Sequence, residues 1–188
     1  MVSTQQIATI TILLGSSLII GSCAQDNTSE IQPIEGVALL EADPNWPLQM
    51  PEDWSWGQVL GVSVDAQDHI WVTHSSQVVE FDPEGNLLRT WGGTQAGDEW
   101  PRMLHGLFVD HNDYVWSGAR EQHTIFKFTK DGEVVLTIGQ LDQMGNSSEP
   151  YLLGRPAEFY VDPDTNELYV ADGYTNRRII IYDAETGG

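Results

Sequence analysis

The sequence has few basic residues and no apolar run long enough to cross a membrane. Eight Lys and Arg residues stand against 28 Asp and Glu residues, which gives a formal net charge of −20. The acidic residues are scattered, and an acidic surface repels phosphate backbones, so we expect no nucleic-acid partner. Acidic disorder is also excluded, because 40% of the residues are hydrophobic and seven Trp, six Tyr and five Phe can build a core.

The N-terminus lacks charge altogether. Residues 1–22 contain no charged side chain, and the mostly apolar run from Ile7 to Ile20 has 14 residues, fewer than the roughly 18 that span a bilayer. A short apolar run followed by small residues is typical of a secretory signal. The segment Ile20-Gly21-Ser22-Cys23 resembles a bacterial lipobox, which implies that Cys23, the only cysteine, is lipidated. The alternative is an ordinary signal peptide with a fortuitous cysteine, because the first six residues lack Lys and Arg.

Three parts of the chain follow from this interpretation. Residues 1–22 are a lipoprotein signal peptide, residues 23–45 a lipidated cysteine with a polar tether, and residues 46–188 the folded domain. We expect the protein in the cell envelope, outside the cytoplasm and anchored to a membrane through its lipid. The folded domain shows no convincing 3.6-residue period, and its short β-branched and aromatic stretches, separated by turn residues, predict an all-β fold.

An internal repeat indicates which all-β fold this is. Asp65 precedes Asp110 by 45 residues, and Trp71 precedes Trp116 by the same number. A period near 40–50 residues with several short strands in each unit predicts the blades of a β-propeller. The two Trp residues fall at equivalent strand positions, so we expect them in the core between blades. A sandwich with a similar number of strands does not explain why the same order of strands recurs.

The third unit carries a more specific resemblance. Residues 161–179, with Val161-Asp162 followed by Leu168-Tyr169-Val170-Ala171-Asp172 and Asn176-Arg177-Arg178-Ile179, resemble the NHL repeat. The resemblance implies a six-bladed propeller of NHL type, of which about three blades are present, at about residues 57–92, 104–139 and 156–188. Because a propeller of three blades leaves unpaired edges, we expect the chain to be an incomplete propeller that aggregates, oligomerises or folds loosely on its own.

Two stretches resemble peptidyl-α-hydroxyglycine α-amidating lyase, namely residues 103–110 and residues 171–178. That family is a six-bladed NHL propeller that cleaves a peptidyl-α-hydroxyglycine to a peptide amide and glyoxylate. It uses a zinc held by three histidines, a Tyr base, an Arg and a structural calcium. The resemblance implies that His105 is a zinc ligand, that the backbone carbonyl of Leu107 faces calcium, and that Tyr174 is the catalytic base. The activity would be that of a carbon–nitrogen lyase.

One position departs from the family pattern. The catalytic Arg of the family follows a His at the end of a second strand, where this chain has His74 followed by Ser75. A Ser cannot orient a carboxylate with a charged fork. Arg120 lies in the corresponding loop of the next unit. The alternatives are therefore a non-catalytic propeller that binds a peptide, protein or glycan at the cell surface, or an inactive fragment.

The remaining histidines have less specific surroundings. His74 is expected to be structural, because it stands next to the position of the missing Arg. His69, His111 and His123 lie beside turn residues, so we expect them to be solvated. His105 has a structural alternative too, a hydrogen bond across the channel at the start of an inner strand.

Overall fold

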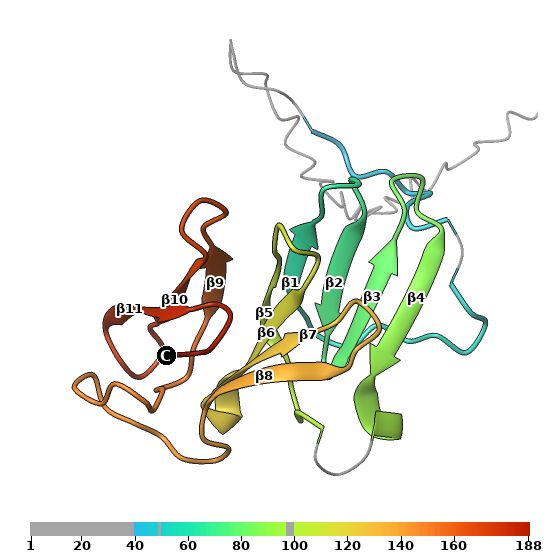
Figure 1. Ribbon diagram of the computed structural model, residues 1–188. Coiled ribbons are helices and arrows are strands. Elements are labelled where there is room, and N and C mark those ends of the chain that lie inside the picture. Colours follow the sequence, from blue (N-terminus) through green and yellow to red (C-terminus); the bar gives the residue numbers. More distant parts are fainter. Residues whose placement is uncertain (1–39, 49, 97–99) are drawn as a thin grey trace, which may run out of the picture. The chain divides into compact units, whose positions relative to one another are not determined.

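The computed structural model describes residues 40–48, 50–96 and 100–188, which form three small antiparallel sheets (Figure 1). We call them blades 1, 2 and 3. Blade 1 contains β1 (Val59–Val64), β2 (Ile70–His74), β3 (Gln77–Phe81) and β4 (Leu87–Gly92). Blade 2 contains β5 (His105–Val109), β6 (Val115–Ala119), β7 (Thr124–Phe128) and β8 (Val134–Gly139). Blade 3 contains β9 (Glu158–Val161), β10 (Glu167–Asp172) and β11 (Arg178–Asp183).

Each blade is a meander in which strands adjacent in sequence pair with one another. Within the described residues the only helical segments are two 3₁₀ turns, η1 (Gly93–Ala96) and η2 (Arg120–Gln122). A series of such meanders, each beginning at its inner strand, is the arrangement expected of propeller blades. The predicted all-β propeller of NHL type is therefore confirmed, with three blades described, the third of them three-stranded.

Side chains alternate between the two faces of each blade. Trp71 in β2 stands opposite Glu80 in β3, and Trp116 in β6 stands opposite Lys127 in β7. We call the face that carries Trp71, Trp116 or its counterpart Tyr169 the front face, and the opposite face the rear face. The pairing register repeats from blade to blade, so equivalent residues face the same way in all three.

The hydrophobic core lies between the blades. Trp71 on the front of blade 1 is fully buried in one cluster with Leu107 and Val109 from the rear of blade 2. Trp116 on the front of blade 2 is fully buried in a second cluster with Phe159 from the rear of blade 3. The prediction that both tryptophans form core between blades is confirmed, and large aromatic areas removed from water stabilise each junction.

A repeated hydrogen-bond pattern explains why Asp and Trp recur together. Oδ2 of Asp65 accepts from Nε1 of Trp71 at 3.0 Å, and Oδ2 of Asp110 accepts from Nε1 of Trp116 at 2.7 Å. The other oxygen of each carboxylate accepts two backbone N–H groups of the following turn. The Asp thus fastens the turn between the first two strands and satisfies the buried indole.

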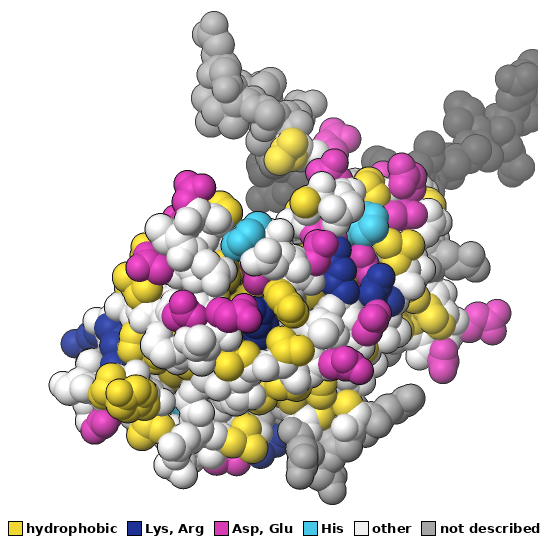
Figure 2. Space-filling view, in the orientation of Figure 1, with side chains coloured by type: hydrophobic (Ala, Val, Ile, Leu, Met, Phe, Trp, Pro, Cys, Tyr) yellow, Lys and Arg dark blue, Asp and Glu magenta, His cyan; other side chains and the backbone are white. Residues whose placement is uncertain are grey.

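The predictions for the N-terminus concern residues outside the part of the chain that the structure describes. The signal peptide, Cys23 and most of the tether precede residue 40, and their assignments stay predictions. Residues 43–188 form one compact unit. No helix in the described part of the chain is long and apolar enough to cross a membrane. Figure 2 shows acidic side chains dispersed over the visible face, in line with the scattered acidic residues of the sequence.

Candidate functional site

His105 and Tyr174 meet at the junction of blades 2 and 3. His105 is the first residue of β5, and Tyr174 lies in the turn between β10 and β11. The hydroxyl oxygen of Tyr174 is 3.1 Å from Nε2 of His105, and the two rings cross at 87° with their centroids 5.2 Å apart. The histidine is half-buried and the tyrosine exposed, so solvent and a ligand can reach the pair.

A backbone carbonyl fixes the protonation of the His105 ring. Nδ1 of His105 lies 3.1 Å from the carbonyl oxygen of Ala157, an oxygen that can only accept. A neutral imidazole therefore carries its proton on Nδ1, and Nε2 presents a lone pair. That lone pair accepts the hydroxyl proton of Tyr174. Because Ala157 immediately precedes β9, the packing of blade 3 against blade 2 sets the orientation of this ring.

The guanidinium group of Arg120 lies next to the tyrosine of this pair. The side chain of Arg120, which follows β6, lies over the ring of Tyr174 with its central carbon 4.9 Å from the ring centroid. Glu121 positions this cation: its Oε1 is 2.9 Å from Nε of Arg120, and its Oε2 is 2.8 Å from Nη2 of Arg155. Two arginines thus share one carboxylate, which leaves a net positive charge beside Tyr174. A half-buried base, an exposed tyrosine and a cation can together bind and deprotonate a small anionic ligand.

Several known proteins are similar to this chain in sequence. No protein-family model matches the chain. The chain is 29% identical over 168 residues to peptidyl-alpha-hydroxyglycine alpha-amidating lyase 2 of Drosophila melanogaster, with 74% of this chain and 39% of that protein covered. It is 39% identical over 111 residues to lyase 1 of the same organism, with 57% and 19% covered. It is 29% identical over 147 residues to human NHL repeat-containing protein 3, with 72% and 40% covered.

The chain is an NHL-type propeller that resembles the amidating lyases. It spans between 19% and 40% of the length of these three relatives. The similarity therefore does not show that this chain has the activity of the whole relatives. Of the residues that the sequence assigns to the site of this lyase-like propeller, the structure brings His105 and Tyr174 together. The side chain of Leu107 is buried between blades 1 and 2, and its role toward calcium stays a prediction.

Ser75 has a structural position in the lyase-like propeller. Its backbone N–H donates to Gln58 at 2.8 Å, and its carbonyl accepts from Leu104 at 2.8 Å, so it ties the ends of blades 1 and 2 together. Its φ of 54° lies in the left-handed region. The neighbouring His74 is buried, and burial lowers the pKa of its imidazole. The backbone N–H of Gly57 donates to Nδ1 of His74 at 3.3 Å, a contact in line with the structural role that the sequence predicts for this residue.

The described residues around His105 do not make a zinc site by themselves. A catalytic zinc needs about three protein ligands, and Nε2 of His105 supplies one. Within residues 40–48, 50–96 and 100–188, only Asp65, His69 and Glu80 come close enough together to share a metal, and they lie elsewhere. The tautomer of His105 suits a zinc ligand, because ligating histidines commonly donate their other N–H to a carbonyl. Zinc there stays a prediction.

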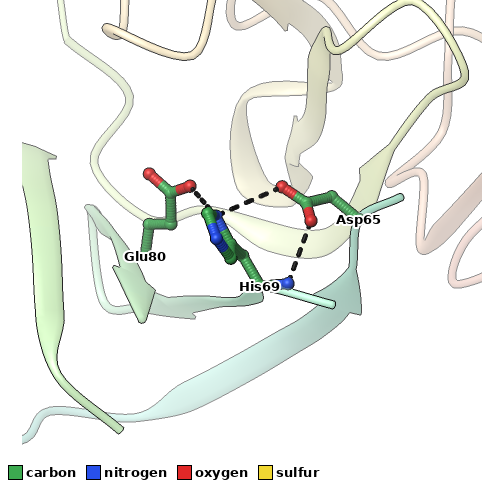
Figure 3. A group of neighbouring side chains, drawn as sticks. All are labelled: Asp65, His69 and Glu80. Atoms are coloured by element: carbon green, nitrogen blue, oxygen red, sulfur yellow. Dashed lines mark hydrogen bonds and ion pairs between the residues drawn. The ribbon is translucent and has the colours of Figure 1, made fainter. Parts of the chain in front are cut away.

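The cluster of Asp65, His69 and Glu80 is better explained as an ion-pair network (Figure 3). Nδ1 of His69 lies 2.8 Å from Oε1 of the buried Glu80, whose other oxygen pairs with Nε of Arg89. Nζ of Lys130 lies 3.2 Å from Oδ2 of Asp65. A divalent metal would have to displace two side-chain cations from these carboxylates, which disfavours a metal at this place.

The hydrogen-bond donors around Asp65 also disfavour a metal at this place. Burial acts to raise the pKa of the Asp65 carboxyl, but hydrogen bonds from Trp71, from two backbone N–H groups and from Lys130 outweigh it and lower the pKa. Its oxygens are therefore occupied as acceptors. The expectation that His69 is solvated is met only in part, because its side chain is 28% exposed and its Nδ1 contacts the buried carboxylate of Glu80, eleven residues later. Alternation along β3 is the one sequence feature that indicates on which face of the blade Glu80 lies.

Proposed function

We propose that this propeller is a peptidyl-α-hydroxyglycine lyase-like protein that binds the α-hydroxyglycine end of a peptide at His105, Tyr174 and Arg120. The observation that carries the proposal is the 3.1 Å contact between Tyr174 and His105. These residues are 69 apart in sequence, and they are the two that the family resemblance assigns to the reaction centre. The resemblance to amidating lyases supports the same substrate class.

The chemistry follows from the protonation of the pair. Tyr174 donates its proton to the lone pair on Nε2 of His105, which leaves a phenolate that removes the proton of the substrate α-hydroxyl group. As the C–O bond becomes a carbonyl, the bond between the α-carbon and the amide nitrogen breaks. The proton held on Nε2 of His105 passes to the leaving nitrogen, so the products are a peptide amide and glyoxylate and both side chains return to their starting state. The guanidinium of Arg120 stabilises the phenolate and attracts the substrate carboxylate.

The experiment measures glyoxylate release from a synthetic peptidyl-α-hydroxyglycine. Tyr174→Phe removes the proton acceptor and is expected to lower turnover by about 10²–10⁴-fold. Tyr151→Phe, at an exposed tyrosine, is the matched control and should change nothing. Ser75→Arg supplies the guanidinium that the family pattern has at this position, so turnover should rise. If neither the natural protein nor the Ser75→Arg variant releases glyoxylate, the lyase proposal is wrong.

A non-catalytic binding function is the second candidate. It is favoured by Ser75, whose backbone joins blades 1 and 2 and whose side chain brings no positive charge. In that case the same face would bind a carboxylate-terminated peptide without cleaving it. Calorimetry with a peptide acid and the matching peptide amide separates the two candidates, because binding without glyoxylate release supports this one.

We also propose that the protein is a lipoprotein of the cell envelope, anchored through Cys23. The support is the Ile20-Gly21-Ser22-Cys23 segment alone, which lies outside the described residues. A clickable fatty acid fed to the cells should label the natural protein, and Cys23→Ser should abolish the label. Release of an unlabelled, processed protein into the medium would mean an ordinary signal peptide.

A further inference from the structure

A carboxylate of the protein itself lies between two arginines beside Tyr174. Oε1 of Glu121 is 2.9 Å from Nε of Arg120, and its Oε2 is 2.8 Å from Nη2 of Arg155. The central carbon of Arg120 is in turn 4.9 Å from the centroid of the Tyr174 ring. We call Arg120 and Arg155 the arginine pair. The tyrosine, the arginine pair and the carboxylate therefore form one continuous group at the junction of blades 2 and 3.

The turn that carries Arg120 and Glu121 is anchored in the protein interior. Both residues belong to η2, and the third residue of that turn, Gln122, is buried. The backbone carbonyl of Gln122 accepts from Oγ1 of Thr124 at 2.8 Å, and its side-chain Oε1 accepts from the backbone N–H of Arg102 at 2.9 Å. Because the turn ends on a buried residue with these two bonds, the side chains of Arg120 and Glu121 start from fixed backbone positions.

Arg155 is fastened to the same turn as Tyr174. The preceding residue, Gly154, donates its N–H to Oδ1 of Asp172 at 2.8 Å, and its carbonyl accepts from the N–H of Thr175 at 3.0 Å. Asp172 is fully buried, and Thr175 follows Tyr174 directly in the chain. The loop before β9 and the turn after β10 therefore hold Arg155 and the tyrosine in one frame.

The backbone of Arg155 supports a role for this residue in binding. Its φ of +68° lies in the left-handed region, where a residue with a side chain is strained. Strained residues of this kind cluster at ligand clamps, because there the surrounding structure maintains a conformation that a function requires. Here the strained residue places a guanidinium group on a carboxylate next to the candidate reaction centre.

The carboxylate of Glu121 is held in a way that allows exchange. Its side chain is 41% exposed, and those of Arg120 and Arg155 are 25% and 45% exposed. Ion pairs so open to water contribute little to stability, because water and salt screen their charges. Two guanidinium groups also carry about ten N–H donors, whereas one carboxylate accepts about four hydrogen bonds. A second carboxylate can therefore compete with Glu121 for the arginine pair.

We propose that the arginine pair is a clamp for the substrate carboxylate, and that this carboxylate binds by replacing that of Glu121. The inference rests on the proposed lyase-like function for the identity of the substrate. An α-hydroxyglycine carries its hydroxyl group and its carboxylate on adjacent carbons, so a carboxylate held by the clamp brings the hydroxyl group to Tyr174. Glu121 is then a specificity-determining residue, because only a ligand that ends in a carboxylate restores the charge that the arginine pair loses when Glu121 leaves.

Isothermal titration calorimetry of the full chain with two uncleavable peptides tests the proposal. The probes are the acetylated dipeptide of phenylalanine and glycine, which ends in a carboxylate, and its C-terminal amide. Neither carries an α-hydroxyl group, so binding is measured apart from cleavage. Glu121→Gln removes the competing charge and should lower the Kd of the acid about tenfold, whereas Arg155→Gln removes half of the clamp and should raise it about tenfold. The Kd of the amide should stay unchanged in both variants.

Asp131→Asn and Arg102→Gln are the matched controls. Asp131 is an exposed carboxylate 2.7 Å from Nη1 of Arg89, in the turn between β7 and β8 and so at the other end of β7 from Glu121. Arg102 is an exposed arginine whose Nη2 lies 2.7 Å from Oδ1 of Asp142. Each control removes the same charge as one test variant, but from an ion pair outside the clamp. Neither should change the Kd of either peptide, and circular dichroism checks that all four variants keep the fold.

The expected gain of affinity separates a clamp from a merely structural ion pair. If Glu121 only stabilised the junction, Glu121→Gln would weaken binding of the acid or leave it unchanged, and that result refutes the clamp. An equal gain for the amide, the same gain in Asp131→Asn, or an unchanged Kd of the acid in Arg155→Gln also refutes it. Glyoxylate release is measured separately. Cleavage without these changes in Kd refutes the clamp and supports the lyase, whereas the changes without cleavage support the clamp in a protein that only binds.

Discussion

Gly106 is the residue whose replacement should damage the junction of blades 2 and 3 most directly. Its φ of +70° lies in the left-handed region, where a side chain costs about 1–2 kcal/mol. A Cβ would also stand 2.5 Å from the carbonyl oxygen of Ala157 and 2.9 Å from the ring of Phe159. Forcing a methyl group into so close a contact costs about a further 1–3 kcal/mol. Gly106→Ala should therefore lower the free energy of unfolding by about 2–5 kcal/mol.

Urea denaturation followed by tryptophan fluorescence, at one fixed protein concentration, measures this loss. Gly173→Ala is the matched control, because that glycine has no atom within 4 Å of its prospective Cβ and lies beside Tyr174. The control should stay within about 0.5 kcal/mol of the natural protein. If Gly106→Ala loses less than about 1 kcal/mol, the close packing of β5 on blade 3 is wrong, and with it the position of His105.

Three further predictions concern pH, the core and metal. Burial lowers the pKa of His74, so the unfolded chain takes up the proton first and stability falls as the pH drops below the ordinary value of about 6.5. In thermal melts, His74→Gln should therefore reduce the fall in Tm between about pH 7 and about pH 5. Trp116→Phe leaves Oδ2 of Asp110 without its 2.7 Å donor and should cost about 1–3 kcal/mol in urea denaturation, or more if a cavity remains. The chain should retain far less than one zinc after dialysis, as read by elemental analysis, because His105 is a single ligand; tight stoichiometric zinc would contradict this.

The repeat made most of the fold predictable from sequence. The spacing of Asp65 and Trp71 from Asp110 and Trp116 marks equivalent strand positions, and the buried Asp–Trp hydrogen bonds give the physical reason for that spacing. Trp46 precedes Trp91 by the same 45 residues and its ring packs on Phe81, yet it stands in a stretch without alternation. Its relation to Gly85 depends on a contact between segments about 40 residues apart, which no local pattern reveals.

The site was predictable only through resemblance. No periodicity brings His105 to Tyr174, since each lies at a strand end and the loop between blades 2 and 3 is longer than the one before. Arg120 was recognisable as the counterpart of Ser75 in the next unit, but its position over Tyr174 follows from the 3₁₀ turn after β6 and from Glu121. Both depend on tertiary packing, which sequence spacing does not encode.

The lone pair on Nε2 of His105 links the chemistry to the way the blades are stacked. The carbonyl of Ala157 keeps the proton on Nδ1, so the same Nε2 atom can accept a proton from Tyr174 or bind a metal, but not both at once. In the described structure it faces Tyr174, with the charge of Arg120 on the other side of the ring. Ala157 and Tyr174 belong to blade 3, whereas the other two residues belong to blade 2. Anything that moves blade 3 relative to blade 2 therefore changes the contact between His105 and Tyr174 and the position of Ala157 beside the imidazole ring.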